Sequence, residues 1–170
     1  LPADCHILGL QDSKRLTARQ REVVYSRIQQ QAVAYSIGSI SHRQIDQHNI
    51  LWATKEAMLN ALYQLQRVPD MLLIDGITAL PTTIAQRLIT RGDVCCASIA
   101  AASVLAKVTR DRLMMSYAKT YPAYGFDKHK GYPTPEHYAR LRIYGPCAIH
   151  RVSFKGVLPE ASHGRGGRDA

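Results

Sequence analysis

The sequence has no long apolar run, no internal repeat and no dense block of like charge. No stretch approaches 18 consecutive apolar residues, which excludes a membrane-spanning helix. No basic segment followed by an apolar stretch opens the chain, so no secretory signal is visible. What remains is a chain of 170 residues, of which 46% are apolar. That length and composition predict one globular domain with a real core.

Acidic residues are scarce. The chain has 13 Asp and Glu against 22 Lys and Arg, which gives a net charge of +9. An excess of positive charge favours a polyanionic partner such as a nucleic acid, but it also serves plain solubility. Charge alone leaves both interpretations open.

The four cysteines show no metal-binding or disulfide pattern. No C-x-x-C is present, and no histidine pair has the spacing of a zinc finger. Cys95 and Cys96 are adjacent, which is poor geometry for an ordinary disulfide. We interpret the cysteines as reduced thiols of a cytoplasmic protein.

Helical spacing of apolar residues and capping residues predict five helical segments. Their predicted ranges are 19–31, 41–45, 50–65, 98–119 and 134–144, and the capping residues are Thr17, Ser41, Asn49 and Thr134.

Three segments are typical of strands. Residues 32–40 alternate small with β-branched or aromatic residues, residues 71–74 form an apolar run that ends in Asp75-Gly76, and residues 84–89 form a third candidate. This order of elements predicts an α/β fold. The domain is expected to cover residues 1–158, and the Gly- and Arg-rich residues 159–170 are expected to be a flexible tail.

Two acids are candidates for metal binding or acid–base chemistry. Asp75 follows a predicted buried strand, and ligands of open α/β sheets bind at such strand ends. Asp93 follows Arg91-Gly92 just before the long helix. Each could instead be a turn residue, since Asp-Gly and Gly-Asp pairs are common in turns.

Residues 126–134 mix bases, turn residues and Tyr132, which suits phosphate contact and ring stacking, although a solvated basic loop has the same composition.

Ordered sequence blocks are together similar to one protein family. The first block, residues 9–16, resembles the G-L-N-D-S-K-K-L of ribonuclease HII, a family with the RNase H-like fold. The later blocks that match the family in the same order are 45–54 (I-D-Q-H-N-I-L-W-A-T), 73–76 (L-I-D-G), 91–93 (R-G-D), 98–103 (S-I-A-A-A-S), 107–111 (K-V-T-R-D), 129–134 (H-K-G-Y-P-T) and 150–154 (H-R-V-S-F). Their shared order makes chance resemblance an unsatisfactory explanation.

The resemblance implies a mixed central sheet flanked by helices and a nuclease activity. Members cut the RNA strand of RNA/DNA hybrids, and incise DNA at embedded ribonucleotides, with four carboxylates that hold two Mg²⁺ or Mn²⁺ ions, leaving 5′-phosphate ends in DNA replication and repair. By this match, Asp75 and Asp93 are the third and fourth carboxylates, catalytic and metal-binding. Tyr132 would pack against the ribonucleotide. The residues expected to face phosphates are Lys14, Lys107, Arg110 and Lys130.

The resemblance stops short of the family's opening strands. The first carries D-E-A-G-R-G, whose acids are the first two carboxylates, and this sequence begins at about the end of the second. We therefore expect a domain without the first two strands, with unpaired edges at 32–40 and 71–75 and no hydrolysis by this chain alone. The full-length protein is expected to be a monomer with no membrane partner.

Two other function classes compete with the nuclease. One is a nucleic-acid-binding remnant of the same fold without catalysis, and the other is a basic interaction domain that uses the fold as a scaffold. The presence of Asp75, Asp93 and Tyr132 favours the nuclease, because a protein that had lost its chemistry would have no need for those particular side chains.

Overall fold

The computed structural model describes residues 1–2 and 4–158 and has both helices and a small sheet. The elements in chain order are α1 (Ala18–Gln31), α2 (His42–Gln47), α3 (Ile50–Tyr63), β1 (Met71–Asp75), β2 (Ala85–Ile89), α4 (Gly92–Cys95), α5 (Ala97–Thr120), the 3₁₀ helix η1 (Pro122–Tyr124), α6 (Phe126–His129) and α7 (Pro135–Tyr144). The predicted α/β class is confirmed. Within the described ranges, no helix has the length and apolar character that crossing a bilayer requires. The expected tail, 159–170, lies outside the described residues.

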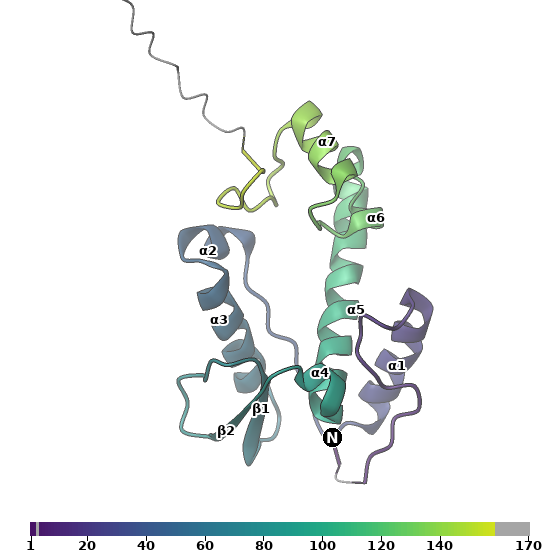
Figure 1. Ribbon diagram of the computed structural model, residues 1–170, viewed down its shortest axis with the longest axis vertical. Coiled ribbons are helices and arrows are strands. Elements are labelled where there is room, and N and C mark those ends of the chain that lie inside the picture. The colour runs from purple at the N-terminus through teal and green to yellow at the C-terminus, as the bar shows by residue number, and fades with distance from the viewer. Residues whose placement is uncertain (3, 159–170) are drawn as a thin grey trace, which may run out of the picture.

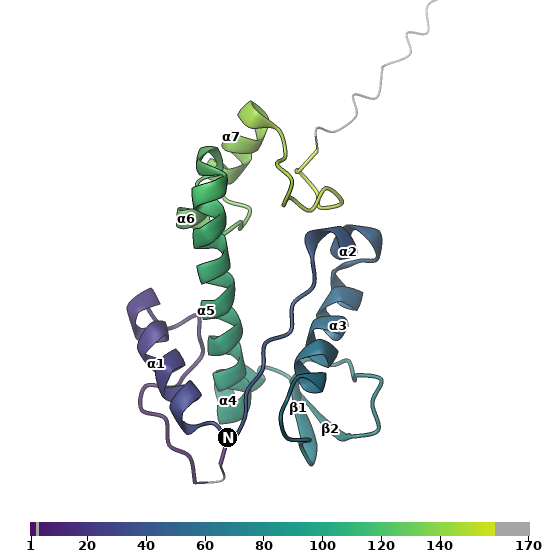
Figure 2. The ribbon, with the colours of Figure 1, turned by 180° about the vertical axis from the view of Figure 1, so that it is seen from behind.

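Helix α5 is the longest element, and the other elements are arranged around it. Figure 1 shows α1 beside the first half of α5, with α6 and α7 at its far end. Helices α2 and α3 and the two strands form a second arm, which joins the first near α4; the reverse view shows the same two arms (Figure 2). The fold therefore consists of a helical arm and an arm that carries the sheet.

The predicted caps begin the helices that they were expected to begin. Thr17 and Ser41 each form a capping box with the glutamine three residues later. Asn49 and Thr134 each accept a hydrogen bond from the backbone N–H three residues later. Each cap satisfies a backbone donor that would otherwise have no partner in the first turn, so the polar residue fixes where the helix starts.

The main core lies between α1 and α5. Ile28 of α1 is 1% exposed and Val104 of α5 is fully buried, with Val24 and Val108 beside them. A second cluster packs η1, α6 and α7 on the end of α5, and a third joins α3 to β1. Because α5 contributes to the first two clusters, it holds the helical arm together.

The two strands are parallel, with Met71 paired with Ala85 and Asp75 paired with Ile89. In a parallel pair both strands end at the same edge, so Asp75 lies next to the chain that leaves β2. Apolar side chains of this sheet are exposed, among them Met71, Leu73 and Leu88, as expected for a strand pair with open edges.

The predicted strand at 32–40 is wrong. The segment is extended but joins no ladder among the described residues. It packs along α3 instead: a Cβ on Gly38 would lie 1.8 Å from the carbonyl oxygen of Ala57, and Ser36 Oγ donates to the carbonyl oxygen of Ala61. Alternation of side chains is a property of any extended backbone, and only a paired neighbour makes such a segment a strand.

The region 122–133, which has no predicted helix, contains the short helices η1 and α6. These short helices end at Gly125 and Lys130, whose φ angles of 72° and 51° are left-handed. A left-handed residue ends a helix after a single turn. The positions of Gly and Pro alone do not distinguish such a short helix from a loop.

The C-terminal segment is tied to α2 by one carboxylate. Asp46 accepts hydrogen bonds from the backbone nitrogens of Val152 (2.9 Å) and Ser153 (3.0 Å) and from Ser153 Oγ. Burial acts to raise the pKa of Asp46, but these hydrogen bonds outweigh it and hold the pKa below its ordinary value. The clasp is therefore formed at neutral pH and is lost as pH falls through that lowered pKa.

We expect Ile28→Ala to destabilise the chain by about 2–5 kcal/mol, because it opens a cavity in the α1–α5 core. Val23→Ala on the exposed face of the same helix should cost less than about 0.5 kcal/mol. Urea unfolding followed by circular dichroism measures both. Equal costs would mean that the α1–α5 interface is not the main core.

We expect Asp46→Ala to release the C-terminal segment from α2. Hydrogen exchange at neutral pH should become faster at the amides of Val152 and Ser153, since both lose their acceptor. Asp70→Ala, at an exposed position, is the control. Unchanged protection in the Asp46 variant would show that the clasp does not hold the segment.

Candidate functional site

Asp75 is the last residue of β1, and it is exposed at the edge where both strands end. Its Oδ1 accepts a hydrogen bond from the backbone nitrogen of Gly92 at 2.9 Å. The chain that leaves β2 thus passes beside Asp75 and is bonded to it.

Asp93 is buried, with 8% of its surface exposed. Its Oδ2 forms an ion pair with Lys14 Nζ at 3.2 Å. The hydrogen bond to Asp93 and its charge, followed by the charges of Asp12 and Asp75, raise the pKa of Lys14. One ammonium group is therefore influenced by both candidate carboxylates. The alternative of an exposed turn acid does not hold for Asp93.

The turn at Arg91-Gly92 places the two acids. Arg91 is left-handed, with φ of 58°, and begins the short helix α4. A Cβ on Gly92 would lie 2.4 Å from Cδ1 of Ile99, so glycine lets α5 lie close to the strand end without displacing that side chain. This close approach brings the nitrogen of Gly92 to Asp75 while Asp93 begins the next turn.

Lys14 reaches the acids from a segment pinned to α5. Ser13 is 3% exposed, and its Oγ lies 2.8 Å from Ser103 Oγ. Asp12 Oδ1 accepts from the backbone nitrogen of Lys14 at 2.9 Å. Ser13 is buried and Lys14 is exposed, so Ser13 anchors the segment and leaves the ammonium free to reach the carboxylates.

The donor set at this edge fits a hard divalent cation that also binds a phosphate. Among the described residues, no group of three or more His, Cys, Asp and Glu side chains could hold a metal ion. Mg²⁺ is commonly held by one or two carboxylates together with substrate phosphates and water. Asp75 and Asp93 fit that mode and do not form a closed structural metal site.

Tyr132 lies in a second, basic group of residues. Its ring is 48% exposed, and Lys107 Nζ and Arg110 Cζ lie 5.2 and 5.8 Å from its centroid. Lys107 also pairs with Asp111 at 2.6 Å, and Arg110 Nη2 donates to the carbonyl oxygen of Lys130 at 3.2 Å. The open part of the ring is available for stacking, and two cations lie next to it.

Lys130 differs from the other predicted phosphate contacts. Its side chain is turned back onto the protein, where Nζ lies 2.8 Å from Met115 Sδ and contacts the carbonyl oxygen of Asp127. Its left-handed backbone and that of Gly131, with φ of 77°, form the turn that presents Tyr132.

The structure thus divides the predicted residues into two groups along α5. Lys14 lies with Asp75 and Asp93 near the start of α5, and Lys107 lies with Tyr132 farther along it. Lys107 lies about ten residues beyond the start of α5, which corresponds to roughly 15 Å of axial rise. A ligand that contacts both groups must be extended.

Three buried histidines lie behind Tyr132 and had no predicted role, although His129 and His150 fall within the matched blocks 129–134 and 150–154. His129, His137 and His150 are each less than 9% exposed, and they surround Phe126. The available sequence signal is that these histidines occur close to aromatic residues. Residue spacing alone, however, does not distinguish a buried histidine from an exposed one.

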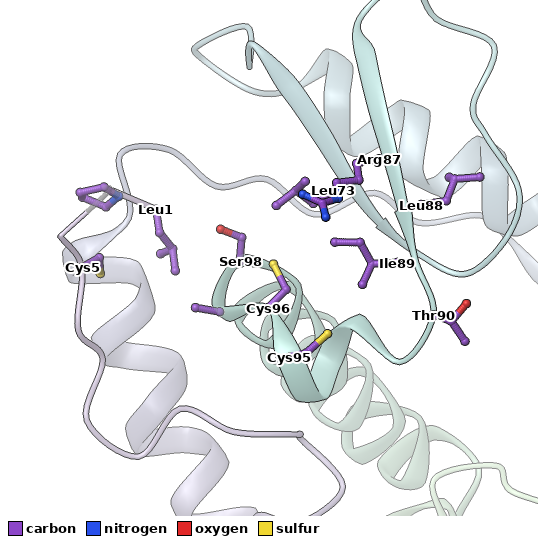
Figure 3. Close-up of a pocket in the computed structure, with 12 residues that line it drawn as sticks. Leu1, Cys5, Leu73, Arg87, Leu88, Ile89, Thr90, Cys95, Cys96 and Ser98 are labelled. Atoms are coloured by element: carbon purple, nitrogen blue, oxygen red, sulfur yellow. The ribbon is translucent and has the colours of Figure 1, made fainter.

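A cavity of about 800 Å³ lies between the N-terminal segment, the sheet and the start of α5 (Figure 3). Leu73, Leu88, Cys95 and Cys96 are among its lining residues. Neither Asp75 nor Asp93 lines it, so this cavity is separate from the carboxylate site.

The chain matches a family model and named relatives over most of its length. The model of ribonuclease HII matches residues 4–157. The ribonuclease HII of Bacillus velezensis is 50% identical over 157 residues, which are 92% of this chain and 61% of that protein. The ribonuclease HII of Geobacter sulfurreducens is 46% identical over 165 residues, 97% of this chain and 76% of that protein. The chain spans about three fifths of the length of the Bacillus relatives.

A solved structure supports the same assignment. The ribonuclease H2 of Pyrococcus horikoshii OT3 has a TM-score of 0.74 and 25% sequence identity, over 88% of this chain and 78% of that one. The expected fold is thereby confirmed. On the family model and the relatives together, this chain belongs to the ribonuclease HII family.

Proposed function

We propose that this chain binds RNA/DNA hybrids and DNA with embedded ribonucleotides, and that it supplies part of an endoribonuclease site that hydrolyses the RNA strand. The observation that carries the proposal is that Asp75 accepts a hydrogen bond from the backbone nitrogen of Gly92, the residue before Asp93, while Asp93 pairs with Lys14. Two acids gathered at one point are unfavourable without a cation, so their proximity supports a cation-dependent role.

Asp75 and Asp93 would hold Mg²⁺ or Mn²⁺ in this proposal. A pair of such ions bound there would supply an activated water and stabilisation of the leaving 3′-oxygen, so that the other product would carry a 5′-phosphate. The protein side chains act around this chemistry. Lys14 neutralises Asp93 before substrate arrives, and its exposed ammonium group can then turn to a substrate phosphate.

Tyr132 and the cations beside it would hold the RNA strand. A half-exposed ring can pack against a sugar or base, and contact at the 2′-hydroxyl separates RNA from DNA. Lys107 and Arg110 lie close enough to the ring to contact the phosphates on either side of a stacked nucleotide. A nucleic acid strand is also the extended ligand that could reach both groups of residues.

A second candidate function is binding without hydrolysis. It is favoured by the finding that the described residues bring no third acid, histidine or cysteine to the carboxylate pair. We expect the 170-residue chain alone to bind hybrids without cleaving them. The cytoplasm is the proposed location, since all four cysteines are free, and the full-length protein is proposed to act as a monomer with no membrane partner.

We expect Mn²⁺ to strengthen hybrid binding by the chain, and Asp75→Asn or Asp93→Asn to reduce that enhancement by at least about tenfold, because each removes a charged ligand. Titration of a fluorescent RNA/DNA hybrid with and without Mn²⁺ measures this, with Asp70→Asn as the control.

The same samples are tested for strand cleavage. Mn²⁺-dependent cleavage that Asp75→Asn abolishes would contradict binding without hydrolysis and support the nuclease. No effect of Mn²⁺ on either binding or cleavage would contradict the metal site.

We expect Tyr132→Ala to weaken hybrid binding by roughly 5- to 150-fold, which corresponds to the loss of one stacking contact worth about 1–3 kcal/mol. Tyr132→Phe should retain most of the affinity because it keeps the ring. Tyr63→Ala removes an equally large exposed ring at the end of α3 and is the matched control. Fluorescence anisotropy at one fixed salt concentration measures all three, and equal affinities of the two alanine variants would contradict a role for Tyr132.

A further inference from the structure

Tyr132 is held from behind by a chain of hydrogen bonds through two buried imidazoles. His137 Nδ1 lies 3.0 Å from the carbonyl oxygen of Tyr132, and His137 Nε2 lies 3.1 Å from His150 Nε2. The backbone nitrogen of Cys147 lies 2.9 Å from His150 Nδ1. Both histidines are 7% exposed, so water does not replace these partners.

The two ends of this chain fix where its protons lie. The backbone N–H of Cys147 can only donate, so His150 Nδ1 accepts and the proton of the neutral ring is on Nε2. His150 Nε2 then donates to His137 Nε2, which leaves the His137 proton on Nδ1. That proton is donated to the Tyr132 carbonyl, which can only accept. Only one arrangement of two neutral rings satisfies all three contacts.

An additional proton would break this chain. A charged imidazole has N–H groups on both nitrogens, so either the two Nε2 atoms or the Cys147 nitrogen and His150 Nδ1 would face each other as donors. Burial, and the mutual proximity of the histidines, lower the pKa of both His137 and His150 below the ordinary value of 6.5. The neutral pair is therefore stable above that value, and its contribution is lost as pH falls through the lowered values.

Other titratable and charged groups surround the pair on all the elements that pack against it. His129 of α6 stacks on His137 with ring centroids 4.3 Å apart, and its Nε2 lies 2.8 Å from the carbonyl oxygen of Tyr124. The further groups that face this cluster, or lie next to it in the chain, are Tyr124 in η1, Glu136 on α7, and Cys147 and Arg151 after α7. The proximity of His129 lowers the pKa of both His137 and His150.

The ring of Tyr132 depends on its backbone for position. The ring is half exposed, and the nearest cations lie more than 5 Å from its centroid. Two left-handed residues precede it, while its own N–H donates to the carbonyl oxygen of His129 and its carbonyl accepts from His137 and Thr134. The bond from His137 is the one contact in this set that comes from a side chain.

We propose that His137, oriented by His150, is a positioning residue that fixes Tyr132 against the ribose, so that discrimination between RNA and DNA requires both imidazoles to be neutral. The inference rests on the proposed role of Tyr132 in binding the RNA strand. It adds two residues that do not touch the substrate and a dependence on pH.

A matched pair of variants distinguishes the contribution of the Nδ1 hydrogen bond of His137 from that of its Nε2 hydrogen bond. His137→Asn keeps an amide nitrogen near the position of Nδ1, where it can donate to Tyr132, and His137→Gln keeps a polar group near Nε2 but gives up that bond. The readout is the ratio of affinities for a DNA duplex with one ribonucleotide and for the same duplex of DNA alone. At pH 7.5 we expect His137→Gln to lower the ratio by roughly 2- to 12-fold, the effect of one hydrogen bond, and His137→Asn to keep it within about twofold.

The outcomes of this pair are separable from failure of the proposed function. If the unmodified chain has no preference for the ribonucleotide duplex, the proposed function itself fails. If the preference exists and His137→Gln retains it, or both variants lose it equally, or only His137→Asn loses it, the positioning role is overturned.

A second measurement needs no variant that could fail to fold. Nitrogen-15 NMR of the unmodified chain should show His150 protonated on Nε2 and His137 on Nδ1 at pH 7.5, and the ribonucleotide preference should fall as pH is lowered from 6.5 through the lowered pKa values of the two histidines. Tyr132→Ala should show no such pH dependence of the ratio. A proton on His150 Nδ1, or a ratio that does not change with pH, would overturn the inference.

Discussion

The burial of one side of α5 is the constraint on which the other features of the structure depend. Val104 has no exposed surface because Ile28 and Val24 of α1 cover it, and Met114 is covered by the cluster of η1, α6 and α7. A helix of 24 residues fixed along its length keeps its two ends at a constant separation. Asp93 near its start and Tyr132 farther along are therefore both held by their packing on this helix, although they come from different elements.

The charges differ between the two groups of candidate residues that lie along α5. At the strand end, Asp93 pairs with Lys14, and Asp75 is bonded to the backbone of Gly92, the residue before Asp93. Around Tyr132, Lys107 and Arg110 lie next to the ring and Lys107 is paired with Asp111, while the histidines behind the ring are buried. The same loop thus combines a charged outer side with a buried imidazole support, which in our proposal links the position of Tyr132 to the protonation of the histidines.

Local rules were sufficient for the elements whose ends are set by local contacts. Thr17, Ser41, Asn49 and Thr134 cap their helices as expected, because a cap bonds to a nitrogen only three residues away. The strand at 71–74 was predicted correctly because a short, fully apolar run that ends in Asp-Gly is typical of a buried strand. The strand expected at 32–40 failed because its status depends on a partner that no pattern within the segment can reveal.

The sequence by itself determined the family, the starts of the capped helices and the choice of Asp75, Asp93 and Tyr132 as candidates, since motif order and spacing are properties of the chain. Tertiary structure decided the rest. It brought Lys14 to Asp93, 79 positions away in sequence, and buried Asp93. It also turned the Lys130 side chain back onto Met115 and placed His137 and His150 behind Tyr132. These results depend on which helix covers which surface. Burial and charge proximity arise from packing between distant segments, and no local pattern in the sequence carries that information.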